Sequence, residues 1–169
     1  MSAVVRLARA ADVNTIVEIA RRGWREGFAG VISPAVIPDP GEMATVIGGY
    51  VSKQARPVTV AVGEQEGEPR GYITFGPARD EDAEPNTAEV YALFVDPPHW
   101  RQGIGRSLVS HALSQLASSG FSEAILWTLA DTPRSRRFYE ALGFTSDGAT
   151  QRREMTGGAL EVRYRIALR

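Results

Sequence analysis

The apolar residues of this chain recur with two periods, which divide it into helices and strands. A period of three to four residues is typical of a helix that buries one face, and a period of two is typical of a strand. Helical spacing predicts a helix that Asp12 caps and that breaks near Gly27, and three more over 42–53, 103–119 and 132–142. Strands are predicted at 4–8, 58–62, 71–75, 89–95, 124–129 and 160–168, with one more between the last helix and residue 160.

The C-terminal strand has the clearest alternation in the chain. Its apolar positions are Leu160, Val162, Tyr164, Ile166 and Leu168. The positions between them are Glu161, Arg163, Arg165 and Ala167. Strict alternation is typical of a sheet with one face on the core and the other in water, so we expect these charged side chains to be solvated.

The predicted elements follow one another in the order β-α-α-β-β-β-α-β-α-β-β. Helices and strands are interleaved, but consecutive strands dominate the middle and the end of the chain. This order predicts an α+β fold, with one mixed, mostly antiparallel sheet and helices on both faces. The length of 169 residues is typical of one domain, and we expect residues 1–169 to form it.

Composition and charge exclude several classes of function. The chain has no cysteine, which excludes disulfides, thiolate metal sites and a cysteine nucleophile. Its 19 basic and 20 acidic residues nearly balance, so nucleic acid is not the expected partner. No apolar run is long enough to span a membrane, and Arg6, Arg9 and Asp12 leave no room for the core of a signal peptide. We expect a cytoplasmic protein without a metal site, since no His, Asp and Glu cluster has metal-ligand spacing.

Residues 79–86 form an acidic segment that holds Asp80, Glu81, Asp82 and Glu84. Two interpretations stay open, a solvated loop and a loop that attracts a cationic substrate. A solvated loop is the commoner role of such a segment.

A turn between a strand and a helix carries the clearest binding signal. Residues 96–98 (DPP) end the strand, because proline cannot donate to a sheet ladder. Gly103 and Gly105 then open a helix whose first N–H groups have no partner within it. These N–H groups favour an anion, and Arg101 and Arg106 can add bonds to phosphate oxygens. Neither a Walker A loop nor a Rossmann fingerprint fits the spacing, but two glycines alone also fit a flexible helix start.

Three segments together resemble the GNAT superfamily of acyl-CoA-dependent N-acyltransferases. They are the strand 89–97 (EVYALFVDP), the turn 101–106 (RQGIGR) and the segment 136–144 (RRFYEALGF). The last segment, at its distance behind the glycine turn, is the specific signal, and the order of elements also matches. The resemblance covers nearly the whole chain and is strongest from Glu89 to Phe144.

The resemblance implies that acetyl-CoA is the co-substrate and that the turn binds its pyrophosphate. The residues implied there are Arg101, Gln102, Gly103, Gly105 and Arg106, with Ile104 packing inward. In this family the strand before the turn splays from its neighbour, which implies backbone contacts of the pantetheine arm with Leu93, Phe94 and Val95. Thr132 stands where the family often has a cofactor-binding asparagine, which implies a weaker contact. Trp100 stands where the family often has glutamine or arginine, which implies the loss of one.

The reaction implied is direct attack of a neutral amine on the thioester, without a covalent enzyme intermediate. The amine must lose a proton and the leaving thiolate should gain one. Tyr139 is the candidate acid, since the resemblance places it beside the sulfur; the alternative is a core tyrosine. Glu89 is the candidate base, on a strand face that period two shares with Tyr91, Leu93 and Val95. The alternative is a structural glutamate paired with an arginine.

The function implied is an N-acetyltransferase that acts on a primary amine of a small molecule or a peptide. The N–H of Val95 or Phe94 is the expected donor to the thioester oxygen, and Trp24, Phe28 and Tyr91 are candidates for the wall of the acceptor pocket. A non-catalytic acyl-CoA-binding or sensing domain of the same fold is the alternative. The acceptor stays open among protein N-termini, lysine side chains, polyamines, amino acids and aminoglycosides. A homodimer through the C-terminal strand pair also stays open.

Overall fold

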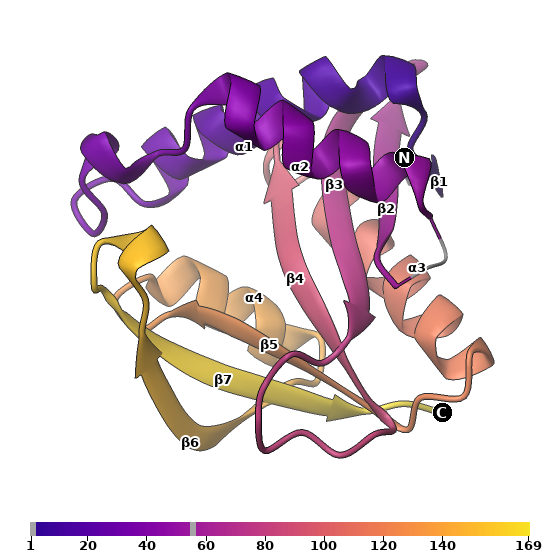
Figure 1. The fold of residues 1–169 in the computed structure, drawn as a ribbon, viewed down its shortest axis with the longest axis vertical. Coiled ribbons are helices and arrows are strands. Elements are labelled where there is room, and N and C mark those ends of the chain that lie inside the picture. Colours follow the sequence, from indigo (N-terminus) through magenta and orange to yellow (C-terminus); the bar gives the residue numbers. More distant parts are fainter. Residues whose placement is uncertain (1–2, 55–56) are drawn as a thin grey trace.

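Seven strands form one sheet in the order β1-β2-β3-β4-β5-β7-β6 in the computed structural model, which describes residues 3–54 and 57–169 (Figure 1). The strands are β1 (Val4–Leu7), β2 (Thr59–Gln65), β3 (Glu68–Pro77), β4 (Thr87–Val95), β5 (Glu123–Leu129), β6 (Thr145–Arg152) and β7 (Leu160–Ala167). The helices are α1 (Val13–Gly27), α2 (Pro40–Ser52), α3 (Ile104–Ser118) and α4 (Pro133–Ala141). Short 3₁₀ turns lie at Ala10–Asp12, Pro34–Val36, Pro97–His99 and Glu154–Thr156.

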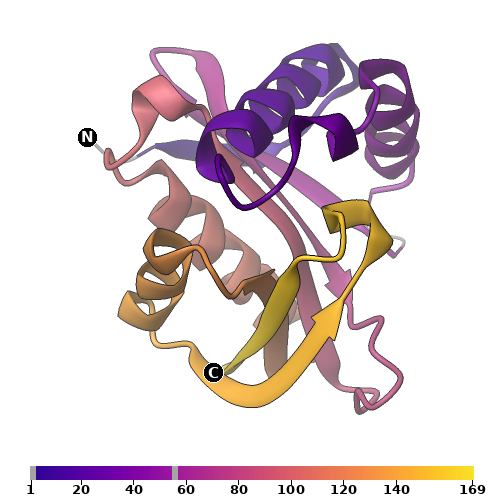
Figure 2. The same cartoon turned by 90° about the vertical axis from the view of Figure 1, so that its left-hand side faces the viewer.

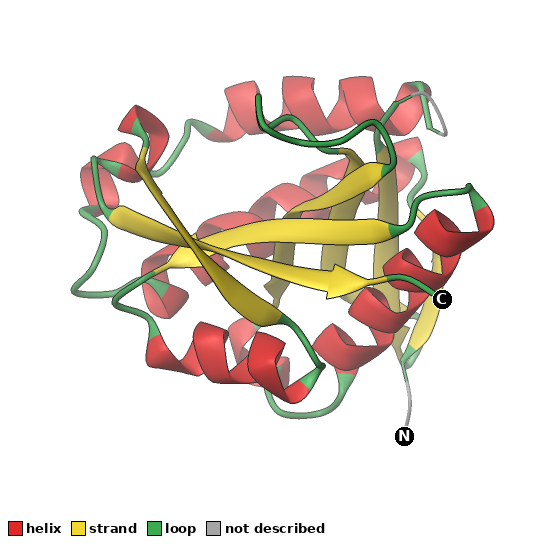
Figure 3. Cartoon of the chain, turned by 90° about the horizontal axis from the view of Figure 1, so that it is seen from below, coloured by secondary structure: helices red, strands yellow, loops and turns green. Residues whose placement is uncertain are grey.

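Helices cover both faces of this sheet (Figures 2 and 3). Neighbouring strands are antiparallel except for β4 and β5, which run parallel. α1 and α2 pack on one face of the β1–β4 half, while α3 packs on the opposite face. The predicted α+β fold, its order of elements and its mostly antiparallel sheet are therefore confirmed. No helix in the described ranges is long and apolar enough to cross a membrane.

Two apolar clusters hold these layers together. Ile16 and Ala20 of α1 pack with Val62 of β2, and all three side chains are fully buried. On the other face Leu108 of α3 packs with Ile73 of β3, and both are likewise fully buried. These helical residues are the apolar positions at three- to four-residue spacing in the sequence. The pattern therefore identified both buried helix faces correctly.

Strand β4 contains a β-bulge, which changes the faces of its side chains. The register between β3 and β4 shifts by one residue at Tyr91. As a result Val90, before the bulge, packs in the same cluster under α3 as Leu93 and Val95, after it. Glu89 therefore lies on the opposite face of the sheet. The prediction that Glu89 shares a face with Leu93 and Val95 is wrong, because a bulge breaks the period of two, whereas Glu89 and Tyr91 both contact Arg79.

β4 and β5 pair over three residues only and then part. Thr87–Glu89 lie opposite Glu123–Ile125, after which β4 stays with β3 and β5 stays with β7. Within the described chain, the edge of β4 that faces β5 has no strand partner beyond Glu89. The splayed strand that the resemblance implied is therefore present.

Glu161 and Arg163 on the second face of β7 are not solvated, contrary to prediction, whereas the Arg165 side chain on the same face is 37% exposed. Glu161 is 2% exposed and Arg163 is 8% exposed, although both alternate with apolar residues. Glu161 is bonded to Arg153, and Arg163 is bonded to Asp80 and other carboxylates. The strand is covered on this face by the segments that carry these partners, so its alternation separates an apolar from an ion-paired face.

Asp12 lies at the start of α1 but does not cap it with its side chain. Its carboxylate accepts the Arg9 backbone N–H at 2.7 Å and pairs with the Arg6 guanidinium at 2.7 Å. The bond from Arg6 holds the pKa of Asp12 below its ordinary value. The predicted capping bond is thus replaced by a link between β1 and the turn before α1.

Gly23 of α1 marks a close approach between that helix and β4. A Cβ built on Gly23 would lie 2.5 Å from the Phe94 ring, whereas one on Gly48 of α2 would meet nothing within 4 Å. Replacing a helical glycine by alanine gains about 0.5–1 kcal/mol of helix propensity. We expect Gly48→Ala to stabilise the protein by that amount and Gly23→Ala to destabilise it by about 1–2 kcal/mol, through overpacking. Urea unfolding of both variants measures this difference, and equal stabilisation would contradict the close approach.

Candidate active site

A cavity of about 470 Å³ lies where β4 and β5 part. Residues 90–95 of β4 and 126–129 of β5 form two of its sides. The other walls come from α1, α2, α4 and the segment after β6, through Trp24, Phe28, Tyr50, Tyr139, Arg153 and Met155. Trp24, Phe28 and Tyr91, the candidates for a pocket wall, all line this cavity.

The backbone of β4 presents hydrogen-bonding groups to the cavity. The Asp96 N–H donates to the Arg70 carbonyl at 2.7 Å, which marks a hydrogen-bonded pair of the β3–β4 ladder. Bonded and non-bonded pairs alternate in an antiparallel ladder. Phe94 therefore turns its backbone groups toward β3, whereas Leu93 and Val95 turn theirs toward the cavity. Of the three predicted backbone contacts the register favours Leu93 and Val95, and Phe94 lines the cavity with its side chain.

Trp100 ties the end of β4 to α4. Its indole N–H donates to the Val95 carbonyl at 2.7 Å. The Arg134 guanidinium lies over the indole ring, 3.7 Å from the ring centroid. The sequence predicted only that Trp100 loses a contact. In the structure Trp100 instead donates to the carbonyl that Val95 turns toward the cavity. The backbone group of Val95 that is left for a ligand in the cavity is therefore its N–H.

Two residues with left-handed backbone shape the turn before α3. Arg101 has φ 63° and Gly103, the N-cap of α3, has φ 85°. Arg101, Gln102, Gly103 and Arg106 are exposed, whereas Ile104 is 1% exposed and packs in the core as predicted. Within the described residues no backbone bond is made by the N–H groups of 101–103. The turn is thus open to an anion.

Gly105 allows α4 to approach α3. A Cβ built there would lie 3.1 Å from the Phe138 ring and 3.6 Å from Val95 Cγ2. The sequence had suggested only that this glycine exposes backbone amides. In the structure it also sets the position of the helix that carries Tyr139.

Thr132 precedes α4, but its hydroxyl does not cap the helix. The residue is 6% exposed, and its Oγ1 is buried without a hydrogen-bond partner in the described chain. Thr132 therefore occupies the N-cap position of α4 without making the side-chain bond of a cap. A buried unpaired hydroxyl is uncommon, because it loses its bonds to water on folding.

Tyr139 of α4 lines the cavity. Its ring meets Phe138 and Phe144 edge to face, at centroid distances of 5.1 and 5.7 Å. Burial raises the pKa of Tyr139 well above its ordinary value. The phenol is therefore a protonated donor at neutral pH.

Glu89 lies beside the cavity and not on its wall. The residue is 2% exposed, and its carboxylate accepts bonds from the Arg79 backbone N–H at 3.0 Å and guanidinium at 2.7 Å. The Arg79 guanidinium also lies 4.1 Å from the centroid of the Tyr91 ring. Burial, followed by the charge of Glu89, raises the pKa of Tyr91 to about 12. The ion pair between Glu89 and an arginine, which the sequence left as an alternative, is therefore present. The next residue of β4, Val90, lines the cavity.

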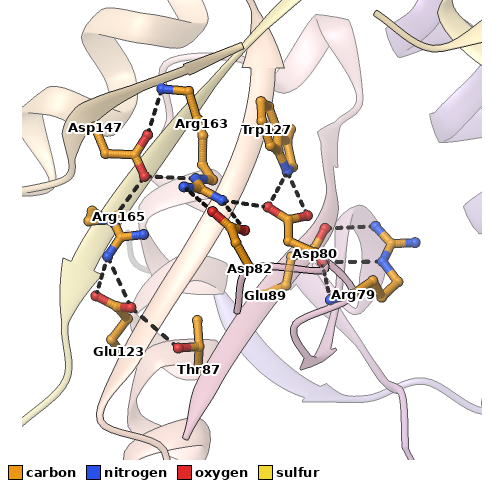
Figure 4. A network of polar contacts seen from close by, with 11 residues as sticks. Arg79, Asp80, Asp82, Thr87, Glu89, Glu123, Trp127, Asp147, Arg163 and Arg165 are labelled. Atoms are coloured by element: carbon orange, nitrogen blue, oxygen red, sulfur yellow. Dashed lines mark hydrogen bonds and ion pairs between the residues drawn. The ribbon is translucent and has the colours of Figure 1, made fainter. Parts of the chain in front are cut away.

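Arg163 joins the acidic segment to the other half of the sheet (Figure 4). Its guanidinium bonds to Asp80 at 2.9 Å, Asp82 at 2.8 Å and Asp147 at 2.7 Å. Asp80 also accepts the indole N–H of Trp127 at 3.0 Å, and Trp127 lines the cavity. The acidic segment is therefore more than a solvated loop, since it holds one wall of the cavity in place.

A second buried pair closes the cavity near β7. Arg153 and Glu161 both line it, and their side chains form two bonds of 2.8 and 2.6 Å. Sequence analysis missed this pair and Trp127. The available signal was the excess of arginine over lysine among the basic residues, since only Lys53 is lysine. Arginine is the side chain that forms such two-pronged bonds with carboxylates.

Neither histidine lines the cavity. Burial lowers the pKa of His111 on α3, so this imidazole is neutral at neutral pH. The structure arranges no group of three or more His, Asp and Glu residues to hold a metal ion in the ranges it describes.

Residues 14–144 match the sequence profile of the Acetyltransferase (GNAT) family. A protein of Mycobacterium tuberculosis named as a probable N-acetyltransferase is 28% identical over 148 residues, which cover 86% of this chain and 82% of the relative. An N-acetyltransferase of Bacillus subtilis is 30% identical over 137 residues, which cover 81% of this chain and 77% of the relative.

Solved structures share the fold over nearly the whole chain. The PaiA N-acetyltransferase of Thermoplasma acidophilum, in complex with coenzyme A, superposes with a TM-score of 0.78 at 19% identity. The match covers 96% of this chain and 98% of that one. A phosphinothricin acetyltransferase of Sinorhizobium meliloti, in complex with acetyl-CoA, superposes with a TM-score of 0.77 at 24% identity. This match covers 99% of this chain and 89% of that one.

Arg163 holds charged groups that burial alone would destabilise. Burial opposes ionisation of Asp147, but the bonds from the Ala149 N–H and from Arg163 hold the pKa of Asp147 below its ordinary value. That stabilisation is present above the ordinary aspartate pKa of ~3.9 and is lost as pH falls through the lower folded pKa. We expect Arg163→Met to cost about 3 kcal/mol of unfolding free energy at pH 7, because it leaves Asp80 without a cationic partner and Asp147 with Arg165 alone.

The loss should shrink at pH 2.5, which lies below the ordinary aspartate pKa of ~3.9, because Asp147 takes up a proton more readily without Arg163. Arg165→Met is the matched control, since its side chain is 37% exposed and pairs with Asp147 and Glu123. It should cost less than about 1 kcal/mol. Urea unfolding at both pH values measures these losses, and a cost for Arg163→Met that is independent of pH would rule out the electrostatic account.

Proposed function

The chain belongs to the acetyltransferase (GNAT) family, and on this basis we propose that it transfers the acetyl group of acetyl-CoA to a primary amine of a small molecule or a peptide. The amine attacks the thioester directly, which suits a chain without a cysteine nucleophile. One observation carries the proposal. The edge of β4 is left free at the split in the sheet, between an open anion-binding turn and Tyr139.

The cleft has groups that suit each part of acetyl-CoA. The N–H groups of residues 101–103, which make no backbone bond within the described chain, suit the pyrophosphate together with Arg101 and Arg106. The backbone groups of Leu93 and the Val95 N–H suit the amides of the pantetheine arm, which adds to β4 as an extra strand would. The unpaired hydroxyl of Thr132 suits a further polar group of the same cofactor.

Charge that develops on the thioester is met by two donors. The Val95 N–H points into the cavity and can donate to the carbonyl oxygen as it becomes negative. Phe94 is the weaker candidate for this role, because its N–H belongs to the β3–β4 ladder. Tyr139 then gives its proton to the leaving thiolate, whose pKa resembles the ~8.5 of cysteine.

Glu89 is the base in this proposal, and it acts through water. An alkyl amine has a pKa of ~10 and must lose a proton before it attacks. The Arg79 pair occupies part of the Glu89 carboxylate, but a carboxylate has about four acceptor positions, so a water molecule can still bond to it. Tyr91 lines the cavity and contacts Arg79, the partner of this carboxylate, so a water molecule along its ring would connect Glu89 to the amine.

Titration calorimetry with acetyl-CoA tests the proposed function. We expect acetyl-CoA and coenzyme A to bind with micromolar Kd and NADH not to bind. Gly105→Val should weaken the binding of acetyl-CoA and of coenzyme A by about tenfold or more, because the valine side chain would meet the Phe138 ring at the turn. Circular dichroism confirms that each variant is folded. A folded wild-type protein that releases no heat with either coenzyme would overturn the proposal.

The proton-transfer roles are tested by the pH dependence of kcat. Tyr139→Phe and Glu89→Gln should each lower kcat by about 10²-fold, with the Kd of acetyl-CoA unchanged. Because burial raises the pKa of Tyr139, wild-type kcat should not fall on the alkaline side below pH ~10. A variant that keeps wild-type kcat across this range removes the substituted residue from the mechanism.

A further inference from the structure

The acceptor side of the cavity is walled by aromatic and thioether side chains. Tyr50, Tyr91 and Trp127 line it, together with Met43 and Met155. Trp127 is held in one orientation by its indole bond to Asp80, and Arg79 already covers one face of the Tyr91 ring. At the rim, Met155 remains 52% exposed. Such a wall favours a flat apolar group over a hydrated chain.

The carboxylates on this side are already neutralised. Glu161 lines the cavity but is bonded to Arg153 at 2.6 Å. Glu89 is bonded to Arg79 at 2.7 Å, and Asp80 is bonded to Arg163 at 2.9 Å (Figure 4). A polycationic acceptor such as a polyamine or an aminoglycoside needs several free carboxylates. The one lining carboxylate without an arginine partner in the described chain is Glu42, which is exposed on α2.

The arginines on this side are neutralised by the same pairs. Arg153, Arg79 and Arg163 each hold a carboxylate that is at least four-fifths buried. Of these three only Arg153 lines the cavity; the second lining arginine, Arg134, lies over Trp100 at the opposite end. An amino acid or a similar acceptor with its own carboxylate would have to share one of these guanidinium groups with a carboxylate that already neutralises it, or break the pair, and a buried carboxylate stripped of its partner is strongly unfavourable.

From this neutral, aromatic wall we propose that the acceptor is a primary monoamine whose body is apolar and ring-bearing and carries no second charge. This inference rests on the proposed function and narrows its acceptor. The ammonium of the incoming amine is the single charge that the site has to accommodate. Ring faces can hold it by cation–π attraction until it loses its proton.

A panel of four amines tests the class of acceptor, with coenzyme A release as the readout. Phenethylamine and phenylalanine are matched, because they differ by one carboxylate. Spermidine and kanamycin represent polycations. We expect kcat/KM for phenethylamine to exceed each of the other three by at least about tenfold. A higher value for spermidine, kanamycin or phenylalanine, or for a peptide N-terminus added to the panel, would overturn the inference.

A gain of activity tests the role of the buried pairs. Glu161→Gln removes the charge that neutralises Arg153 and leaves that guanidinium free to bind a carboxylate. We expect the ratio of kcat/KM for phenethylamine to that for phenylalanine to fall by about tenfold in this variant. This ratio does not depend on the fraction of folded enzyme. An unchanged ratio would show that the pair does not set the specificity.

The wall itself is tested at Trp127. Trp127→Leu should raise KM for phenethylamine by about tenfold and leave the Kd of acetyl-CoA unchanged. Equal KM values in the two proteins would overturn the proposed wall. A protein that binds acetyl-CoA but acetylates no amine of the panel overturns the inference alone, whereas one that does not bind acetyl-CoA overturns the proposed function.

Discussion

The structure depends on one break in hydrogen bonding, between β4 and β5. The two strands pair over three residues and then part, while each keeps its other neighbour. A strand edge inside a protein is costly to leave unpaired, because its N–H and C=O groups lose water. Here the loss is compensated in part by Trp100, which bonds to the Val95 carbonyl. The remaining groups give the cavity its polar side and make it suited to an extended ligand.

Two halves of a sheet that share so few bonds need other links. Arg163 of β7 supplies one, since it bonds to Asp80 and Asp82 of the loop between β3 and β4. The Trp100–Arg134 contact supplies another, between the end of β4 and α4. Buried ion pairs add little net stability, but they hold their partners in a single arrangement when every group is paired. These links therefore hold the two halves of the sheet together across the cleft.

Most of the fold could be predicted from local patterns, and the errors have physical causes. Helical spacing identified the buried faces of α1 and α3, because burial there involves whole apolar stripes. The bulge at Tyr91 left no mark in the alternation of β4, so Glu89 was assigned to the wrong face. On β7 the charged positions suggested solvent, but partners from residues 80 and 153, distant in the sequence, bury them. The turn 101–106 and Tyr139 were located by motif, whereas the bond made by Trp100 depends on a contact that no motif contains.

The two ends of the cleft differ in what their arginines do. At the turn, Arg101 and Arg106 are exposed and, within the described residues, pair with no carboxylate. Near β7, Arg153 and Arg163 are bound to carboxylates. Free guanidinium groups attract an anion, while paired ones leave a neutral wall. An anionic coenzyme and an apolar monoamine would thus be sorted to opposite ends of one cleft by charge. The reacting atoms would then meet where β4 and β5 part, beside Tyr139.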